Sequence, residues 1–172
     1  TLTTAYLSLR LCQPAVDPVV MPFDTIEAAV LGGEVDAGLL IHEGQLTYAD
    51  RGLHRWLDLG EWWHGETGLP LPLGGNVVRR DLHGGPALIG AISEDLKQSI
   101  LYGLSHRPAA LAHAQRYARD LEPARTDRFV GMYVNAYTVD YGPLGRRAVE
   151  VLLARGFSSG LLPRRVTAEF VP

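Results

Sequence analysis

The chain has 172 residues, of which 47% are hydrophobic, and its formal net charge is −3. This composition is typical of a folded globular protein, and the length is sufficient for one good-sized core or two small lobes. The acidic balance argues against a nucleic-acid-binding surface, and no apolar run approaches the ~20 residues that a membrane-spanning helix needs.

A helical pattern opens the chain. Leu2, Tyr6 and Leu9 follow helical spacing, and Thr3 or Thr4 can cap the helix with a side-chain oxygen. In α/β folds such a helix normally follows a strand, and no strand precedes it here. We therefore expect this polypeptide to be the C-terminal part of a longer protein.

Strand-like and helical segments alternate in the next part of the chain. Residues 19–23 predict a short strand interrupted by a proline, and residues 35–41 predict a buried strand bounded by glycine. Between them, Asp24 and Glu27 have the spacing of a capping box, and a glycine pair after Leu31 ends the helix. This order predicts a parallel sheet covered by helices, which is an α/β fold.

A stiff connection follows this alternating region. Residues 44–52 predict a short helix that ends at a glycine, and residues 53–59 predict another strand-like segment. Because two prolines within residues 61–75 exclude a central strand or a helix interior, we interpret that stretch as an apolar crossover. Residues 76–80 then predict a strand that returns to a sheet.

The C-terminal half is predicted to be mostly helical. Its first helix carries an apolar stripe at helical spacing, formed by Leu88, Ile92, Leu96, Ile100 and Leu104. Further helices are predicted from Pro108 to about Leu121, at 126–138 and at 144–155, with glycines at 156 and 160 breaking the chain before an extended tail at 166–171.

Motifs for several kinds of chemistry are absent from the sequence. A single cysteine, Cys12, allows no internal disulfide and no multi-cysteine metal site, so we expect a reducing, cytoplasmic location. The six histidines form no HExxH motif, and there is no CxxC. GxSxG, P-loop and GxGxxG motifs are missing too, so we expect no metal site and no nucleotide cofactor.

The end of the strand predicted at 35–41 carries a titratable pair, His42 and Glu43. Open α/β folds place ligand contacts at this edge of the sheet. His42 is therefore a candidate general base, oriented by a nearby carboxylate such as Glu43. The alternative is a core histidine satisfied by a backbone partner, with Glu43 only starting the next helix.

The predicted start of the first helix offers a second candidate site. Free backbone N–H groups and the hydroxyls near Thr3, Thr4 and Ala5 suit an anionic group such as a carboxylate. Ordinary N-capping is the alternative, and the residues alone favour it.

Aromatic and amide side chains form two weaker candidates. Trp62 and Trp63 could stack on an aromatic ligand, although such a pair more often belongs to a core. Asn135, Tyr137 and Tyr141 could line a cleft, or they could form the polar side of a packed helix.

Several motifs together resemble a known enzyme family, the 1,4-dihydroxy-6-naphthoate synthases of the futalosine route to menaquinone. The motifs that carry the resemblance are GEVDAGLLIHE at 33–43, TY at 47–48, GL at 52–53, DLGEWW at 58–63, TGLPLPLG at 67–74, RRDL at 79–82, YVNAYT at 133–138 and GRRAV at 145–149. They extend over essentially the whole chain, so the resemblance is far more specific than any single motif.

This resemblance implies a fold, a reaction and a site. The fold would be an α/β, periplasmic-binding-protein-like (type II) two-lobed fold, incomplete here by roughly the first hundred residues of the family. Residues 1–75 would form most of the second lobe, and residues 76–172 would return to the first lobe and add the C-terminal helices. The enzyme would be a carbon–carbon lyase that cleaves cyclic dehypoxanthine futalosine without a metal or organic cofactor.

The resemblance also assigns roles to residues. The histidine of its Ile-His-Glu motif, here His42, would be the catalytic base, and Thr4 and Ala5 would contact the substrate. Thr3 joins them as a candidate only because it lies at the same predicted helix start. Two other functions remain open at this point. One is a chorismate dehydratase of the same pathway and fold, and the other is a module that binds a small anionic solute.

Overall fold

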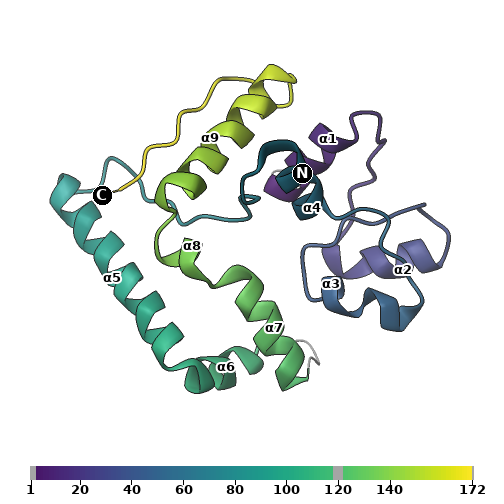
Figure 1. The fold of residues 1–172 in the computed structure, drawn as a ribbon, viewed down its shortest axis with the longest axis horizontal. Helices are drawn as coiled ribbons and strands as arrows, with labels where there is room; N and C mark the ends of the chain where they lie inside the picture. Colours follow the sequence, from purple (N-terminus) through teal and green to yellow (C-terminus); the bar gives the residue numbers. More distant parts are fainter. Residues whose placement is uncertain (1–2, 118–121, 172) are drawn as a thin grey trace. The chain divides into compact units, whose positions relative to one another are not determined.

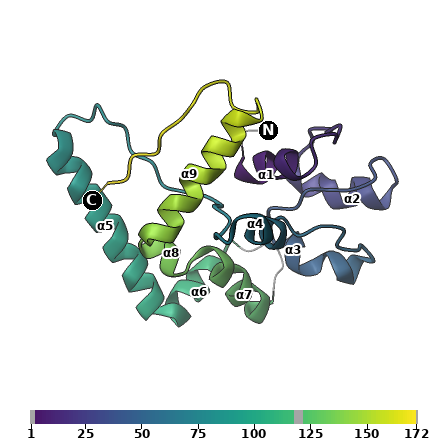
Figure 2. The same cartoon turned by 45° about the horizontal axis from the view of Figure 1, so that its top comes forward.

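The computed structural model describes residues 3–117 and 122–171, and the chain divides into two compact units (Figures 1 and 2). Unit 1 comprises Thr1–Leu73 and Leu144–Thr167, and unit 2 comprises Gly74–Pro143 and Ala168–Pro172. The first boundary lies two residues before the expected one at 75. Residues 144–167 belong to the same unit as the N-terminal segment, whereas the sequence analysis placed them with residues 76–143.

Helices make up the regular structure of the described residues. In unit 1 they are α1 (Thr4–Cys12), η1 (Phe23–Thr25), α2 (Ile26–Leu31), α3 (Gly44–Thr47), η2 (Tyr48–Arg51), α4 (Leu59–Thr67) and α9, which starts at the boundary (Gly142–Ser158). In unit 2 they are α5 (Gly85–Ser105), α6 (Arg107–Gln115), α7 (Pro123–Tyr133) and α8 (Ala136–Val139). No helix among the described residues is long and apolar enough to cross a membrane.

Several predicted helices are confirmed in place. Thr3 is the N-cap of α1, where its Oγ1 accepts a hydrogen bond from the Tyr6 N–H at 3.1 Å. The glycine pair ends α2, with Gly33 at a positive φ of 73°. Gly52 ends η2 in the left-handed region. The apolar stripe predicted in the C-terminal half lies on α5.

The predicted strands have no counterpart in the part of the chain that the structure describes. The segments in question, 19–23, 35–41, 53–59 and 76–80, are mostly irregular. A strand exists only through backbone hydrogen bonds to a neighbouring strand, and no such ladder forms among the described residues. Apolar side chains that a sheet would bury are therefore exposed, Val20 at 71% and Val77 at 97%. The parallel sheet stays a prediction.

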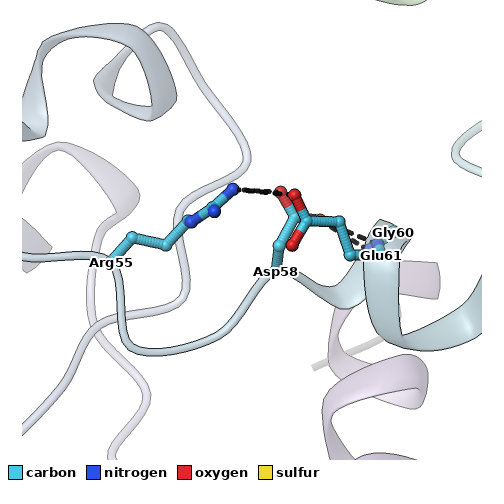
Figure 3. A network of polar contacts seen from close by, with 4 residues as sticks. All are labelled: Arg55, Asp58, Gly60 and Glu61. Carbon is cyan, nitrogen blue, oxygen red and sulfur yellow. Dashed lines mark hydrogen bonds and ion pairs between the residues drawn. The ribbon is translucent and has the colours of Figure 1, made fainter.

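Helix α4 replaces part of the predicted strand and crossover. Asp58 starts it as an N-cap, because its Oδ1 accepts hydrogen bonds from the N–H groups of Gly60 at 2.8 Å and Glu61 at 3.1 Å (Figure 3). Nη1 of Arg55 lies 3.2 Å from Oδ2 of Asp58 and 3.1 Å from Oε1 of Glu61. Coulombic attraction to Glu61 raises the pKa of Arg55. The prolines that excluded a helix all follow α4.

Three other boundaries also differ from the prediction. The helix predicted at 126–138 is two helices, because Asn135 lies in extended conformation between α7 and α8. Gly156 does not break the chain, because it lies buried within α9. The capping box is wrong as well, since no side chain caps η1 or α2, and Glu27 is buried. The part of the second C-terminal helix predicted at 118–121 lies outside the described residues.

Trp63 is the centre of the core of unit 1. It is completely buried, and its Nε1–H donates a hydrogen bond to the carbonyl of Pro70 at 3.0 Å. The guanidinium of Arg155, from α9, lies 5.4 Å from the ring centroid of Trp63, and Ala148 and Leu152 of α9 are also buried. Burial of a tryptophan this complete contributes several kcal/mol, since Trp→Ala in a core costs about 3–5 kcal/mol.

Close packing at Gly156 joins α9 to α1 within unit 1. A Cβ at Gly156 would lie 3.0 Å from Leu162 and 3.1 Å from Leu7 of α1. Figures 1 and 2 both show α1 beside α4, and these helices are in contact. Unit 1 therefore packs α1, α4 and the α9 segment around Trp63.

Unit 2 has a much thinner interior. Among its described residues only Thr126 is buried. Helix α6 packs against α5 and α7, and Arg107 links α6 to α7, because its Nε donates to Oδ1 of Asp127 at 2.7 Å and its Nη2 donates to the carbonyl of Asp127 at 3.0 Å. The apolar side chains of unit 2 therefore remain largely accessible to solvent, and Leu96 of α5 is 40% exposed.

Replacement of Asp58 by Ala is expected to destabilise unit 1 by about 1 kcal/mol, the usual cost of losing an N-cap. Urea unfolding followed by tryptophan fluorescence reports on this unit, because Trp56, Trp62 and Trp63 all belong to it. Asp36→Ala, at an exposed aspartate outside the helices, is the control and should change stability by less than about 0.5 kcal/mol. Equal effects of the two variants would contradict the capping role.

Candidate functional site

His42 lies in the turn that leads into α3, with both ring nitrogens in contact with the backbone. Nδ1 accepts a hydrogen bond from the Gly44 N–H at 2.9 Å, and Nε2 lies 3.2 Å from the carbonyl oxygen of Phe23. The ring also packs at 5.5 Å between centroids against the ring of Phe23. Because the Gly44 N–H can only donate, Nδ1 presents its lone pair, and the proton of the neutral ring is on Nε2.

A buried carboxylate lies over the same turn. A Cβ on Gly44 would meet Oε1 of Glu27 at 2.1 Å and Cε1 of His42 at 2.5 Å, so both side chains close on this backbone position. Glu27 is 5% exposed, and its Oε2 lies 3.1 Å from Nη1 of Arg51. Elements η1, α2, α3 and η2 thus build the surroundings of His42.

Glu43 occupies the N-cap position of α3 in a helical conformation, and its side chain makes no capping hydrogen bond. Its carbonyl accepts hydrogen bonds from the Leu46 N–H at 2.8 Å and from the Thr47 hydroxyl at 3.5 Å. The carboxylate that closes on the His42 turn is that of Glu27. Orientation of His42 by Glu43 stays a prediction.

The second candidate site lies at the start of α1. The Thr4 hydroxyl donates to the carbonyl of Leu73, so the hydroxyls of Thr3 and Thr4 both have structural partners. A hollow of about 280 Å³ nevertheless lies beside them, lined by Thr3, Thr4, Tyr6, Leu7, Arg10, Leu161 and Leu162. Ala5 is half-buried and does not line it.

Arg10 gives this hollow a positive charge. Its Nη1 donates to the Tyr6 hydroxyl at 3.3 Å and its Nη2 to the carbonyl of Pro14 at 3.2 Å, while its Nε is buried without a hydrogen-bond partner in the structure. Arg10 belongs to the last turn of α1 but lines the same hollow as Thr3 and Thr4, and a guanidinium suits a carboxylate. The hollow thus brings one cationic side chain near two threonine residues, and the anion site at Thr3 and Thr4 stays a prediction.

The two candidate sites both belong to unit 1, but they are built on different elements. Thr3 and Thr4 bond within α1 and to Leu73, whereas His42 bonds to Phe23 and Gly44. Glu27 of α2 lies against Gly44 of α3, whereas α1 contacts α4, and Figure 1 shows α2 beside α3.

Three of the aromatic and amide candidates, Trp63, Asn135 and Tyr141, have structural roles, whereas Trp62 is half-buried and Tyr137 is 42% exposed. Trp63 is core, as described above. Asn135 caps α8, because its Oδ1 accepts from the Tyr137 N–H at 2.9 Å and its own N–H donates to Oγ1 of Thr138 at 3.1 Å. The Tyr141 hydroxyl donates to the carbonyl of Gly74 at 3.4 Å. For these residues the packing alternative describes the structure better than a cleft.

The basic motif at 79–82 pairs with acidic residues. Arg79 forms two hydrogen bonds with Asp81, of 2.9 and 2.6 Å, and Arg80 forms an ion pair with Glu169 at 3.0 Å. The hydrogen bonds from Arg79 lower the pKa of Asp81. All four side chains are exposed.

Sequence reasoning missed Glu27, Gly44 and Arg10. Glu27 was interpreted as part of a helix cap, and neither of the other two lies in a recognisable local pattern. An acidic residue within an apolar helix face was the one available signal for Glu27. Within the described residues, no group of three or more His, Cys, Asp or Glu side chains could hold a metal ion.

Comparisons with known proteins agree with one another. The sequence matches a family model described as menaquinone biosynthesis over residues 1–158. It is 41% identical to the 1,4-dihydroxy-6-naphthoate synthase of Streptomyces coelicolor and 43% identical to that of Thermus thermophilus, over 94% and 92% of this chain. A crystal structure of an Archaeoglobus fulgidus protein is similar with a TM-score of 0.88 and 44% identity, covering 93% of this chain and 60% of that protein. The chain spans 58% of the length of either synthase.

Replacement of Gly44 by Ala is expected to destabilise unit 1 by about 1–3 kcal/mol, because the new methyl group would overlap Glu27 and the His42 ring. Gly65→Ala is the matched control, since a Cβ there has no neighbour within 4 Å. In the helix interior this change should stabilise by up to about 1 kcal/mol. Urea unfolding of both variants measures the difference, and two equal values would contradict the described turn.

Replacement of Arg79 by Gln should raise the pKa of Asp81 toward its ordinary value, because the variant loses both hydrogen bonds to the carboxylate. The stabilisation from this pair is present above the ordinary pKa of aspartate and is lost as the pH falls through the lowered pKa. A carboxyl-detected NMR titration of both proteins measures the shift. Identical titration midpoints would show that the pair does not persist in solution.

Proposed function

The chain belongs to the menaquinone biosynthesis family, and we propose that it carries the catalytic base of a 1,4-dihydroxy-6-naphthoate synthase. Its substrate would be cyclic dehypoxanthine futalosine, and the reaction a carbon–carbon cleavage. The observation that carries this proposal is the similarity to two named synthases at 41–43% identity over nearly the whole chain. Since the chain spans 58% of their length, the activity of the whole protein is part of the proposal.

His42 is the proposed general base. Its Nδ1 holds the lone pair of the neutral ring, while a backbone N–H occupies that lone pair in the structure. Proton removal therefore requires the imidazole to release the Gly44 N–H and turn toward the substrate. Positioned general-base catalysis contributes typically ~10²–10⁴-fold to the rate. Removal of the proton would start the carbon–carbon cleavage, and loss of the sugar-derived fragment would give the naphthoate.

The hollow beside α1 is the proposed position for an anionic group of the substrate. Thr3, Thr4 and Arg10 line it, and the first backbone N–H groups of a helix favour negative charge. Ala5 does not line the hollow, and its contact with the substrate stays a prediction. A carboxylate or a sugar hydroxyl of the substrate would bind in this hollow. The carbon atoms that react would belong to another part of the same substrate molecule.

We base the proposed fold and cellular compartment of the protein on its sequence. We propose an α/β, periplasmic-binding-protein-like fold of two lobes for the complete protein, supported by the alternation of helical and strand-like segments. The single cysteine supports a reducing compartment such as the cytoplasm. The proposed reaction needs proton transfer and bond cleavage, and we assign no cofactor to it.

Replacement of His42 by Ala should lower turnover by about 10²–10⁴-fold with little change in KM, because the imidazole takes a proton only in the reaction. Conversion of cyclic dehypoxanthine futalosine is followed by liquid chromatography. The assay uses the chain itself and a version completed with the part of the Thermus thermophilus synthase that lies outside the match. His54→Ala, at an exposed histidine of the same unit, is the control.

Different outcomes separate the proposed function from its rivals. Product from the completed version with wild-type His42, and almost none from His42→Ala, would support the lyase. Full activity of the His42→Ala variant would contradict the base assignment. If the folded, completed version binds the substrate without product, the chain is a binding module. Turnover of chorismate instead would identify the dehydratase.

A further inference from the structure

Glu27 is an unusual residue for its position on α2. Its side chain is 7% exposed, and Oε2 forms an ion pair with Arg51 at 3.1 Å but accepts no hydrogen bond in the structure. Burial of a carboxylate is unfavourable unless its partners fully compensate for the lost hydration. The neighbouring buried residue of the same helix, Ala29, is apolar. Packing of α2 therefore does not by itself account for a glutamate here.

The other carboxylate oxygen lies against the turn that holds His42. Oε1 of Glu27 and the His42 ring both lie within 2.5 Å of the position that a Cβ on Gly44 would take. Glycine at this position lets the carboxylate rest on the backbone of residue 44. Arg51, from η2, is 61% exposed and holds the carboxylate from its other oxygen. One oxygen of the carboxylate thus lies against Gly44, and the other forms the ion pair with Arg51.

The backbone of Gly44 in turn determines the state of the imidazole. The Gly44 N–H donates to Nδ1 of His42 at 2.9 Å, which leaves the proton of the neutral ring on Nε2, next to the Phe23 carbonyl. The tautomer of a histidine is set by the hydrogen bond that its other nitrogen makes. Any group that fixes the Gly44 amide therefore fixes the tautomer and orientation of His42.

We propose that Glu27 is a positioning residue for His42, holding the Gly44 amide against Nδ1 with the help of its ion pair to Arg51. The catalytic meaning of this arrangement rests on the proposed function of His42 as the base. Glu27 itself touches no reacting atom. It keeps the lone pair on Nδ1, the nitrogen that takes the proton once the ring releases Gly44.

The experiment measures the imidazole nitrogens of His42 by NMR in the 172-residue chain. The pH is set about two units above the ordinary histidine pKa of ~6.5, so that an ordinary ring is neutral. The variants are Glu27→Gln, which keeps the side-chain shape without the charge, and Arg51→Gln, at an exposed side chain. Glu66→Gln is the matched control, because Glu66 forms an ion pair with Arg155 elsewhere in unit 1.

The proposal predicts a protonated Nε2 and an unprotonated Nδ1 in the wild type and in Glu66→Gln. Glu27→Gln should give a mixture of the two tautomers, and Arg51→Gln should change in the same direction by less. In the completed version, Glu27→Gln should lower kcat at least about tenfold, with KM changed less than about threefold, because misplacement of a catalytic group affects the reaction rather than binding.

Each outcome decides the proposal. An unchanged tautomer in a folded Glu27→Gln variant overturns it, and so does a wild type with the proton on Nδ1. If Glu27→Gln does not fold, an unchanged tautomer in Arg51→Gln overturns it, and a shifted one supports it. If the tautomer shifts as predicted but the completed wild type forms no product, the positioning role stands and the proposed lyase function fails.

Discussion

The hydrogen bond from the Trp63 indole to the carbonyl of Pro70 connects the core of unit 1 to the proline-rich segment after α4. Trp63 is completely buried, so its donor group must have a partner. That partner lies at the start of the proline-rich segment after α4, and three residues later Leu73 accepts the hydroxyl of Thr4. The core residue thus also holds the segment that supports the start of α1 and the hollow beside it.

Backbone groups likewise hold the side chain of His42, the other candidate site of unit 1. Its ring has no free nitrogen, because Gly44 and Phe23 occupy both. The proposed base is well oriented by these contacts, but it must break one of them before it can take a proton. The buried Glu27 lies against Gly44, whose N–H donates to Nδ1 of His42. The local geometry therefore favours one tautomer of the ring and leaves the lone pair of Nδ1 occupied.

Local patterns predicted the helices well and the strands poorly, for a physical reason. Helical hydrogen bonds and caps are made within one segment, so Thr3, Gly52 and the stripe on α5 could be read from the sequence. A strand requires hydrogen bonds to a distant segment, and Val20 and Val77 remain exposed where that partner is absent from the described residues. The prolines obscured α4, although both follow the helix, and Asp58 was not recognised as its N-cap.

The sequence by itself determined the family and offered His42 and the start of the first helix as candidate sites, because these depend on short motifs and on residue chemistry. Only the tertiary structure decided what surrounds them. Glu27 meets Gly44, 17 positions away along the chain, and Arg10 lines the same hollow as Leu161 and Leu162, which lie near the other end of the sequence. Such contacts depend on how helices pack, and the packing of separate helices has no signal in local spacing.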